Sequence, residues 1–302
     1  MASQLFGLLT LRIASGATLA DAALVVVQQN RALSRPSLAP LHLLYAPNGR
    51  AIAPSQQFGT LAALRGPHNH LSKGLDMSVP HTLESGALVA FVERVRREFA
   101  QAARVLKETR TLSATNTFQA YQRVPDTDLV VAVSAPTPWA QSQEVQAVVV
   151  SLDGKVVHGD PKASAHGPRY AGVFLEAPEV DVVIHVHGPY LGAWASAHRP
   201  LPILYAPAQR YTKAREIPIY IDRRPGEPRF IVDTIRRDPN IPAILEANGG
   251  ATFWGKNILE VSQYILILEE GAYFQALAES LGGSKEFGPG VLEQQWKMTG
   301  LA

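Results

Sequence analysis

The apolar run at residues 180–187 constrains this chain most. It reads Val-Asp-Val-Val-Ile-His-Val-His, and Gly188-Pro189 follows as a turn. Nearly continuous valine and isoleucine is the pattern of a strand that is buried on both faces. Because a strand sends alternate side chains to one face, His185 and His187 should point the same way. The run therefore predicts a buried strand that ends in a pair of imidazoles.

A histidine pair of this kind has two interpretations. Histidine is the commonest metal-binding side chain, and two imidazoles on one face offer a divalent metal two ligands. Alternatively, both rings are hydrogen-bonded core residues. The strand spacing and the position directly before a loop favour a metal.

Composition limits the class of protein and the ligands of any metal. Of the 302 residues, 46% are hydrophobic and 18% charged, which is enough for a sizeable core, and the net charge is only +2. The sequence has no basic stripe that would predict binding to nucleic acid or to an anionic membrane. It also has no apolar run with the length of a membrane span. The absence of cysteine excludes disulfides and thiolate ligands, and it is consistent with a cytoplasmic protein.

The chain divides by pattern into an N-terminal extension, residues 1–82, and a domain, residues 83–302. Apolar residues at helical spacing predict a helix from Leu88 to Leu106. Strands and helices then alternate irregularly, which predicts helices packed on a mixed sheet. The expected strands are 129–134, 145–152, 156–157, 180–187, 217–221, 243–247 and 251–254, and the expected later helices are 169–175, 230–237 and 258–281.

Four motifs in order resemble the class II aldolase/adducin family, which includes sugar-phosphate aldolases and epimerases. They are Asn116, residues 151–157 (Ser-Leu-Asp-Gly-Lys-Val-Val), residues 184–190 around the histidine pair, and residues 248–257 followed by Leu268-Glu269-Glu270. The resemblance spans about residues 85–285. It implies an α/β fold, a three-layer α/β/α sandwich around a mixed β-sheet, and a metal-dependent enzyme. Relatives are commonly tetramers, so it also implies a homo-oligomer.

The chain departs from this family at the implied metal site. Family enzymes carry a third histidine in an Asn/Ser-His-Gly motif, where this chain has Gly249 beside Asn248. The family's acidic residue near the metal corresponds to His166. The resemblance thus implies three nitrogen ligands, His166, His185 and His187, holding zinc, iron(II) or manganese. In the competing interpretation His166 is a loop residue and the metal has been lost, as in adducin-type relatives. Asn248 could also serve as a weak oxygen ligand.

The phosphate-binding turns of the family are changed as well. They read Thr115-Asn116-Thr117-Phe118 and Ser134-Ala135-Pro136 here. Glycine lets backbone amides approach a phosphate, and serine adds a donor, but Phe118 and Pro136 supply neither. We therefore expect a substrate that is not a phosphorylated sugar. Asn116, Asn248 and Phe118 are candidate substrate-binding residues, although a single phenylalanine is more often a core residue.

Other residues must then move protons and bind a substrate carboxylate. Tyr190, Tyr211 and Glu216 are candidates for the proton transfer, as is a metal-bound hydroxide. Tyr211 falls roughly where epimerases carry an acidic residue, and Glu216 could equally be a surface charge. Arg210 could pair with a substrate carboxylate, or it could equally be an ordinary surface residue beside a loop.

The resemblance, together with these departures from it, implies three alternative functions. The first is a metal-dependent lyase that acts on a carbon–carbon bond of a non-phosphorylated oxo or hydroxy acid. The second is a non-haem iron(II) oxygenase of an aromatic oxo acid in secondary metabolism, as in some proteins with this fold. The third is a non-catalytic, adducin-like interaction protein. In the two enzyme hypotheses the partner is a small-molecule substrate.

Overall fold

The computed structural model describes residues 85–160, 169–222 and 225–301. All of them belong to one compact unit, which spans residues 74–302. The expected N-terminal extension and His166 lie outside the described residues. The domain boundary near residue 82 therefore stays a prediction.

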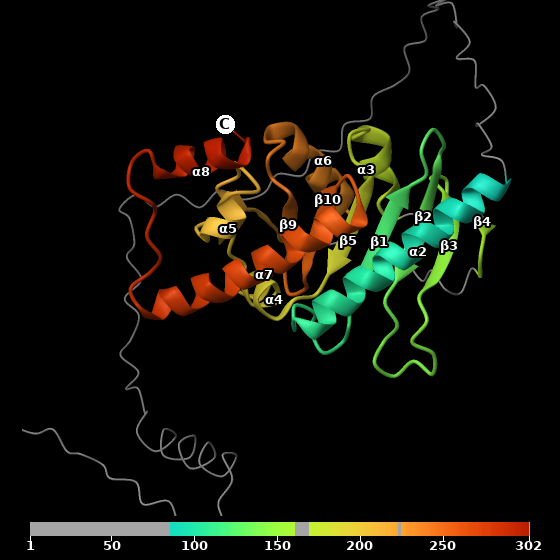
Figure 1. Ribbon diagram of the computed structural model, residues 1–302, viewed down its shortest axis with the longest axis horizontal. Helices are drawn as coiled ribbons and strands as arrows, with labels where there is room; N and C mark the ends of the chain where they lie inside the picture. Colours follow the sequence, from blue (N-terminus) through green and yellow to red (C-terminus); the bar gives the residue numbers. More distant parts are fainter. Residues whose placement is uncertain (1–84, 161–168, 223–224, 302) are drawn as a thin grey trace, which may run out of the picture. The chain divides into compact units, whose positions relative to one another are not determined.

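One sheet of eight strands organises this unit (Figure 1), in the order β4-β3-β2-β1-β5-β10-β9-β8. Neighbouring strands are antiparallel except β8 and β9, which are parallel, so the sheet is mixed as expected. Its strands are β1 (Phe118–Arg123), β2 (Leu129–Ser134), β3 (Gln146–Ser151), β4 (Val156–His158), β5 (Val182–Val186), β8 (Ile219–Tyr220), β9 (Ala243–Glu246) and β10 (Ala251–Gly255). Strands β6 (Leu201–Pro202) and β7 (Glu216–Ile217) form a second, two-stranded sheet.

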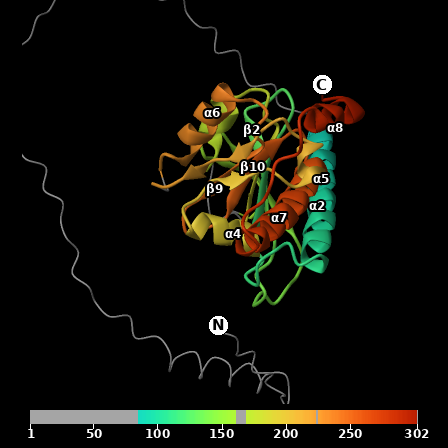
Figure 2. The ribbon, with the colours of Figure 1, turned by 90° about the vertical axis from the view of Figure 1, so that its left-hand side faces the viewer.

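Helices cover both faces of the large sheet (Figures 1 and 2), which confirms the three-layer arrangement. Helices α2 (Ser85–Glu108) and α7 (Ile258–Ser280) pack together on one face. Helices α3 (Ala171–Glu176) and α6 (Glu227–Arg237) pack together on the other. The remaining helices are α4 (Pro189–Ser196), α5 (Ala206–Gln209) and α8 (Val291–Thr299).

The core lies between these layers and follows the apolar pattern of the sequence. In α2 the buried positions recur at helical spacing, as Val92, Val95, Phe99, Ala102 and Leu106. All five residues of β5 are buried, because β5 is an inner strand of a sheet that helices cover on both faces. The continuous valine and isoleucine of this strand thus reflect its central position.

Some elements differ from the sequence prediction. The strand expected at residues 217–221 is divided at Pro218 into β7 and β8, which belong to different sheets. Proline has no amide proton, so it interrupts a continuous ladder. Strand β1 and helices α4 and α8 were not predicted. In the parts of the chain that the structure describes, every helix is too short or too polar to cross a membrane.

Candidate metal centre

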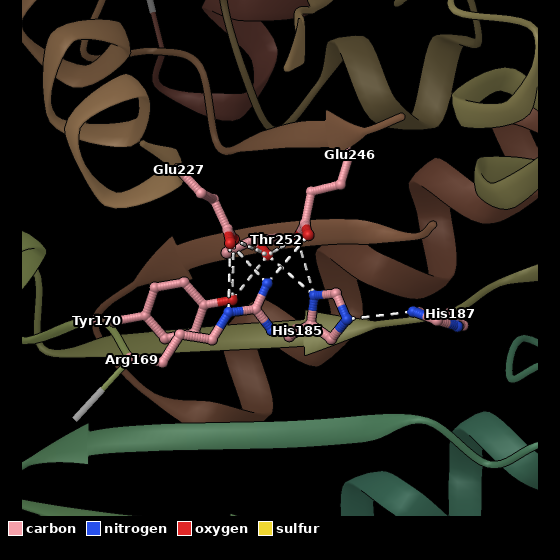
Figure 3. A network of polar contacts seen from close by, with 7 residues as sticks. All are labelled: Arg169, Tyr170, His185, His187, Glu227, Glu246 and Thr252. Atoms are coloured by element: carbon pink, nitrogen blue, oxygen red, sulfur yellow. Dashed lines mark hydrogen bonds and ion pairs between the residues drawn. The ribbon is translucent and has the colours of Figure 1, made fainter. Parts of the chain in front are cut away.

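The two histidines converge at the end of β5 (Figure 3). The Nε2 atoms of His185 and His187 are 3.2 Å apart, and the two rings meet at an interplanar angle of 75°. A tetrahedral ion with metal–nitrogen bonds of about 2.0–2.1 Å holds its nitrogen ligands roughly 3.3 Å apart. The pair thus has the spacing of two ligands of one ion, and this spacing also fits an N–H···N hydrogen bond.

The opposite edge of the His185 ring contacts a carboxylate. Its Nδ1 atom lies 2.9 Å from Oε1 of Glu246 and 3.1 Å from Oγ1 of Thr252. Thr252 stands directly opposite His185 in the ladder between β5 and β10, and Glu246 ends the next strand, β9. Three adjacent strands therefore supply the histidine and its two partners.

A buried ion-pair network continues from this carboxylate (Figure 3). The guanidinium of Arg169 bridges Glu227 Oε2 at 2.6 Å and Glu246 Oε2 at 3.0 Å. The hydroxyl of Tyr170 donates to Glu227 Oε1 at 3.0 Å and lies 3.1 Å from Thr252 Oγ1. Arg169 and Tyr170 directly precede α3, and Glu227 begins α6, so the network joins the helical layer to the sheet.

Burial and charge set the protonation states in this network. Burial alone would raise the pKa of Glu246, but the hydrogen bonds from His185 and Thr252 and the charge of Arg169 hold that pKa well below its usual range. Burial and repulsion from Glu246 raise the pKa of Glu227, against the opposing charge of Arg169. Burial is the largest cause that raises the pKa of Tyr170 well above its ordinary value. The negative charges of Glu227 and Glu246 raise this pKa further. Glu246 is therefore the carboxylate that stays ionised beside His185.

His185 and His187 fit two of the ligands of a metal site. Imidazoles that bind metals usually donate their second ring N–H to a carboxylate or carbonyl, and His185 has such a partner in Glu246. Among the residues that the structure describes, no third His, Asp, Glu or Cys completes a cluster with this pair. The expected third ligand, His166, lies outside the described residues, so the three-histidine site stays a prediction.

Tyr190 lies next to this centre in the sequence and lines a separate cavity. It is the second residue of α4, three residues after His187, and its ring packs on Tyr273 with centroids 4.7 Å apart. The cavity has a volume of about 360 Å³ and is also lined by Glu269. Both oxygens of Glu269 accept backbone N–H groups of α4, from Tyr190 and Leu191, at 2.6 and 2.9 Å. Burial nevertheless raises the pKa of Glu269 to about 6.

Of the other three charged or aromatic candidates, Arg210 and Tyr211 follow α5, and Glu216 lies on β7. The ring of Tyr211 packs edge-on against Tyr264, whose hydroxyl donates to the Tyr211 carbonyl. The guanidinium of Arg210 donates to Gln295 of α8 at 2.7 Å. Glu216 is exposed on β7 opposite Pro202. Their roles in proton transfer and carboxylate binding stay predictions.

The candidate substrate-binding residues lie at three different places. Phe118 is 1% exposed and stacks on Phe99 of α2, which is a core position. Asn116 adopts a left-handed backbone at a φ of 53° and lines a cavity together with Pro136. Asn248 is exposed in the turn between β9 and β10, also at a φ of 53°.

The network residues Arg169, Tyr170, Glu227, Glu246 and Thr252 were not predicted as site residues. One signal was present in the sequence, because Glu246 interrupts the apolar run at residues 243–247. A charge inside a strand that is buried on both faces needs a partner, but the sequence does not say which residue provides it.

Comparison with known proteins places this arrangement in a family. The model of the family described as "Class II Aldolase and Adducin N-terminal domain" matches residues 97–276, more than half of the chain. The chain belongs to this family.

Individual relatives are more distant. An L-ribulose-5-phosphate 4-epimerase, UlaF, of Salmonella paratyphi C is 25% identical over 146 residues, which are 44% of this chain and 63% of the epimerase. The chain thus spans less than two thirds of the length of this curated relative. An L-fuculose 1-phosphate aldolase structure superposes with a TM-score of 0.54 at 18% identity, over 68% of this chain and 95% of the aldolase. The corresponding aldolase of Glaciozyma antarctica PI12 gives 0.55 at 15% identity, over 71% and 86%. These superpositions establish the fold.

Proposed function

We propose that this protein is a metal-dependent lyase that acts on a carbon–carbon bond of a non-phosphorylated oxo or hydroxy acid. The observation that carries the proposal is the 3.2 Å approach of the His185 and His187 Nε2 atoms, with the far edge of His185 committed to Glu246. The chain belongs to the class II aldolase and adducin family, one of its relatives is an epimerase, and its fold resembles that of an aldolase. These likenesses support the reaction class.

His185 and His187 would hold the divalent cation through their Nε2 atoms, with His166 as the proposed third ligand. When bound, such a cation supplies a Lewis acid for a carbonyl or enediolate oxygen. Tyr190, Tyr211 and Glu216 stay the proposed candidates for moving a proton on the substrate. Zinc, iron(II) and manganese all accept imidazole nitrogen.

Backbone hydrogen bonds support a substrate without a phosphate. The amide of Asn116 donates to the Ser113 carbonyl at 2.9 Å, and the amide of Ala135 donates to the Phe118 carbonyl at 2.8 Å. Pro136 has no amide proton. These backbone donors are thus engaged or absent at the turns where relatives bind phosphate. Lys107 lines the cavity beside Asn116, so a phosphorylated sugar is a necessary comparison in any assay.

We also propose that the protein acts as a cytoplasmic homo-oligomer, most simply a tetramer. Large apolar side chains are exposed near the end of α7, with Phe274 at 45%, Leu277 at 48% and Leu281 at 85%. Light scattering after gel filtration tests the assembly state directly, and a monomer at micromolar concentration would contradict the proposal.

The test of function combines metal analysis with an assay. The full chain is purified without chelators, its metal is quantified, and carbon–carbon cleavage is measured on 2-oxo and hydroxy acids and on phosphorylated sugars. We expect zinc or manganese, cleavage of the acids, and loss of both metal and cleavage in His185→Ala. Iron with oxygen consumption on aromatic oxo acids would favour an oxygenase instead. A protein without metal, or a folded His185→Ala variant with full activity, would contradict the proposal.

A further inference from the structure

The hydrogen-bond acceptors around His185 define which of its nitrogens carries a proton. The Thr252 hydroxyl contacts the carboxylates of both Glu227 and Glu246, so its single proton goes to one of them. Towards His185 the hydroxyl oxygen is then an acceptor. The other neighbour of His185 Nδ1 is the Glu246 carboxylate, which is an acceptor too. Nδ1 therefore carries a proton, and in the neutral imidazole Nε2 presents a lone pair.

Glu246 is itself held in one position. Its second oxygen, Oε2, accepts from Arg169 at 3.0 Å, and its first oxygen, Oε1, accepts from His185 and Thr252. The side chain of Glu246 is 4% exposed and that of Arg169 is 8% exposed, so water does not compete for these bonds. A carboxylate restrained in this way fixes both the tautomer and the rotation of the ring that it contacts.

We propose that Glu246 is a positioning residue that directs the Nε2 lone pair of His185 toward Nε2 of His187. Arg169 and Thr252 hold the carboxylate in place, and Glu227 in turn holds Arg169. The paired imidazoles are thus set for a cation before any cation arrives. This inference rests on the proposed metal function for its purpose, but the tautomer of His185 can be measured without metal.

The experiment measures this tautomer by nitrogen NMR on the full chain, with ¹⁵N-labelled histidine and all metal removed. The His185 signals are assigned by their loss in His185→Gln. We expect a protonated Nδ1 and a non-protonated Nε2 in the wild-type protein. In Glu246→Met we expect a mixture of tautomers, whereas Glu246→Gln keeps a carbonyl oxygen for Nδ1–H and should retain the wild-type signals. Glu227→Gln perturbs the same network, where Glu227 contacts Thr252, Tyr170 and Arg169, but it leaves the Glu246 carboxylate beside Nδ1 and should retain the wild-type signals.

Zinc affinity, measured by competition with a chelator, supplies the second readout. Loss of a carboxylate that orients a ligating histidine weakens metal binding about 10–100-fold. We expect a loss in this range for Glu246→Met, and smaller losses for Glu246→Gln and Glu227→Gln. Circular dichroism establishes that each variant is folded.

Three outcomes decide between the possibilities. A wild-type His185 protonated on Nε2 would overturn the inference without any variant, even if Glu246→Met does not fold. A folded Glu246→Met protein with the wild-type tautomer and zinc affinity would also overturn it. Glu246→Met can also change the tautomer while neither the wild-type protein nor the variant binds zinc. In that case the role of Glu246 in fixing the tautomer of His185 stands, and the proposed metal function fails.

Discussion

Strands β2 and β3 bury valine against valine, whereas β5, β10 and β9 bury a histidine, a threonine and a glutamate side by side. In the first half of the sheet, Val131, Val148 and Val149 are 0% exposed, and each contributes about 1.5–3 kcal/mol by leaving water. In the second half, His185, Thr252 and Glu246 are at most 5% exposed. Such polar groups destabilise a core unless every hydrogen bond and charge is satisfied.

This difference teaches which half tolerates change. Apolar packing is lost in proportion to the atoms removed, so a valine substitution has a graded effect. The polar half works as a unit, because removal of one member leaves another charge or donor buried without a partner. The function that we propose depends on this less tolerant half.

The largest expected effect comes from Arg169→Met, which leaves the buried Glu227 and Glu246 without their shared cation. Breaking a buried ion pair from one side costs about 3–5 kcal/mol. Urea unfolding of the variant should show a loss of this size. Arg104→Met is the control, since the pair of Arg104 with Glu108 is exposed, at 60% and 62%, and such pairs contribute about 0–1 kcal/mol. Equal losses in the two variants would contradict the comparison.

A reciprocal exchange of threonine and valine sharpens the contrast between the halves. Thr252→Val removes a hydroxyl that contacts two carboxylates and Tyr170, and should lower the unfolding free energy by about 3 kcal/mol. Val149→Thr places a hydroxyl among buried valines and should lower it by about 2 kcal/mol. Both are measured by denaturant unfolding, and a gain in stability for Thr252→Val would mean that the polar network is dispensable.

The pH dependence of stability tests the buried carboxyl of Glu269, outside both halves. Its pKa is raised from 4.5 to about 6, so the native chain binds this proton more tightly than the unfolded chain. Its contribution is then complete below pH 4.5 and is lost as the pH rises through 6, by about 2 kcal/mol in total. The difference between wild type and Glu269→Gln in unfolding free energy should change by this amount between pH 4 and pH 7. A difference that does not vary with pH would show that the carboxyl titrates normally.

The smallest expected effect concerns a purely local feature, the start of α7. The Asn257 side chain accepts the backbone N–H of Glu260 at 2.9 Å, and it donates to the Glu260 carboxylate. Asn257→Ala should lower the unfolding free energy by about 1 kcal/mol, and Asn257→Asp should restore most of it. Thermal unfolding followed by circular dichroism resolves both shifts.

Most of the fold could be predicted from local sequence, because the apolar residues of most helices and strands repeat with a spacing that is visible within a few residues. Helix α2 and strands β2 and β5 are of this kind. Strand β1 was not predicted, because Gln119, Gln122 and Arg123 interrupt its apolar pattern, and their partners are contributed by β5 and the segment before it. Pro189 was taken as part of a turn, although it is also the first residue of α4.

The candidate site was predictable only where its residues are neighbours in the sequence. His185 and His187 were found because two residues of strand bring their rings together. Glu246 lies 61 residues beyond His185, and Arg169 lies 77 residues before Glu246, so their meeting depends on the strand order of the whole sheet. The strand order of the sheet cannot be predicted from any local sequence pattern.

Calorimetric titration of the metal-free full chain with zinc tests the central claim most directly. The account predicts one zinc site per chain in the wild-type protein, and no saturable binding in a folded variant that carries His185→Gln and His187→Gln. Wild-type stoichiometry and affinity in that double variant would contradict the account, because the cation would then be held by other residues.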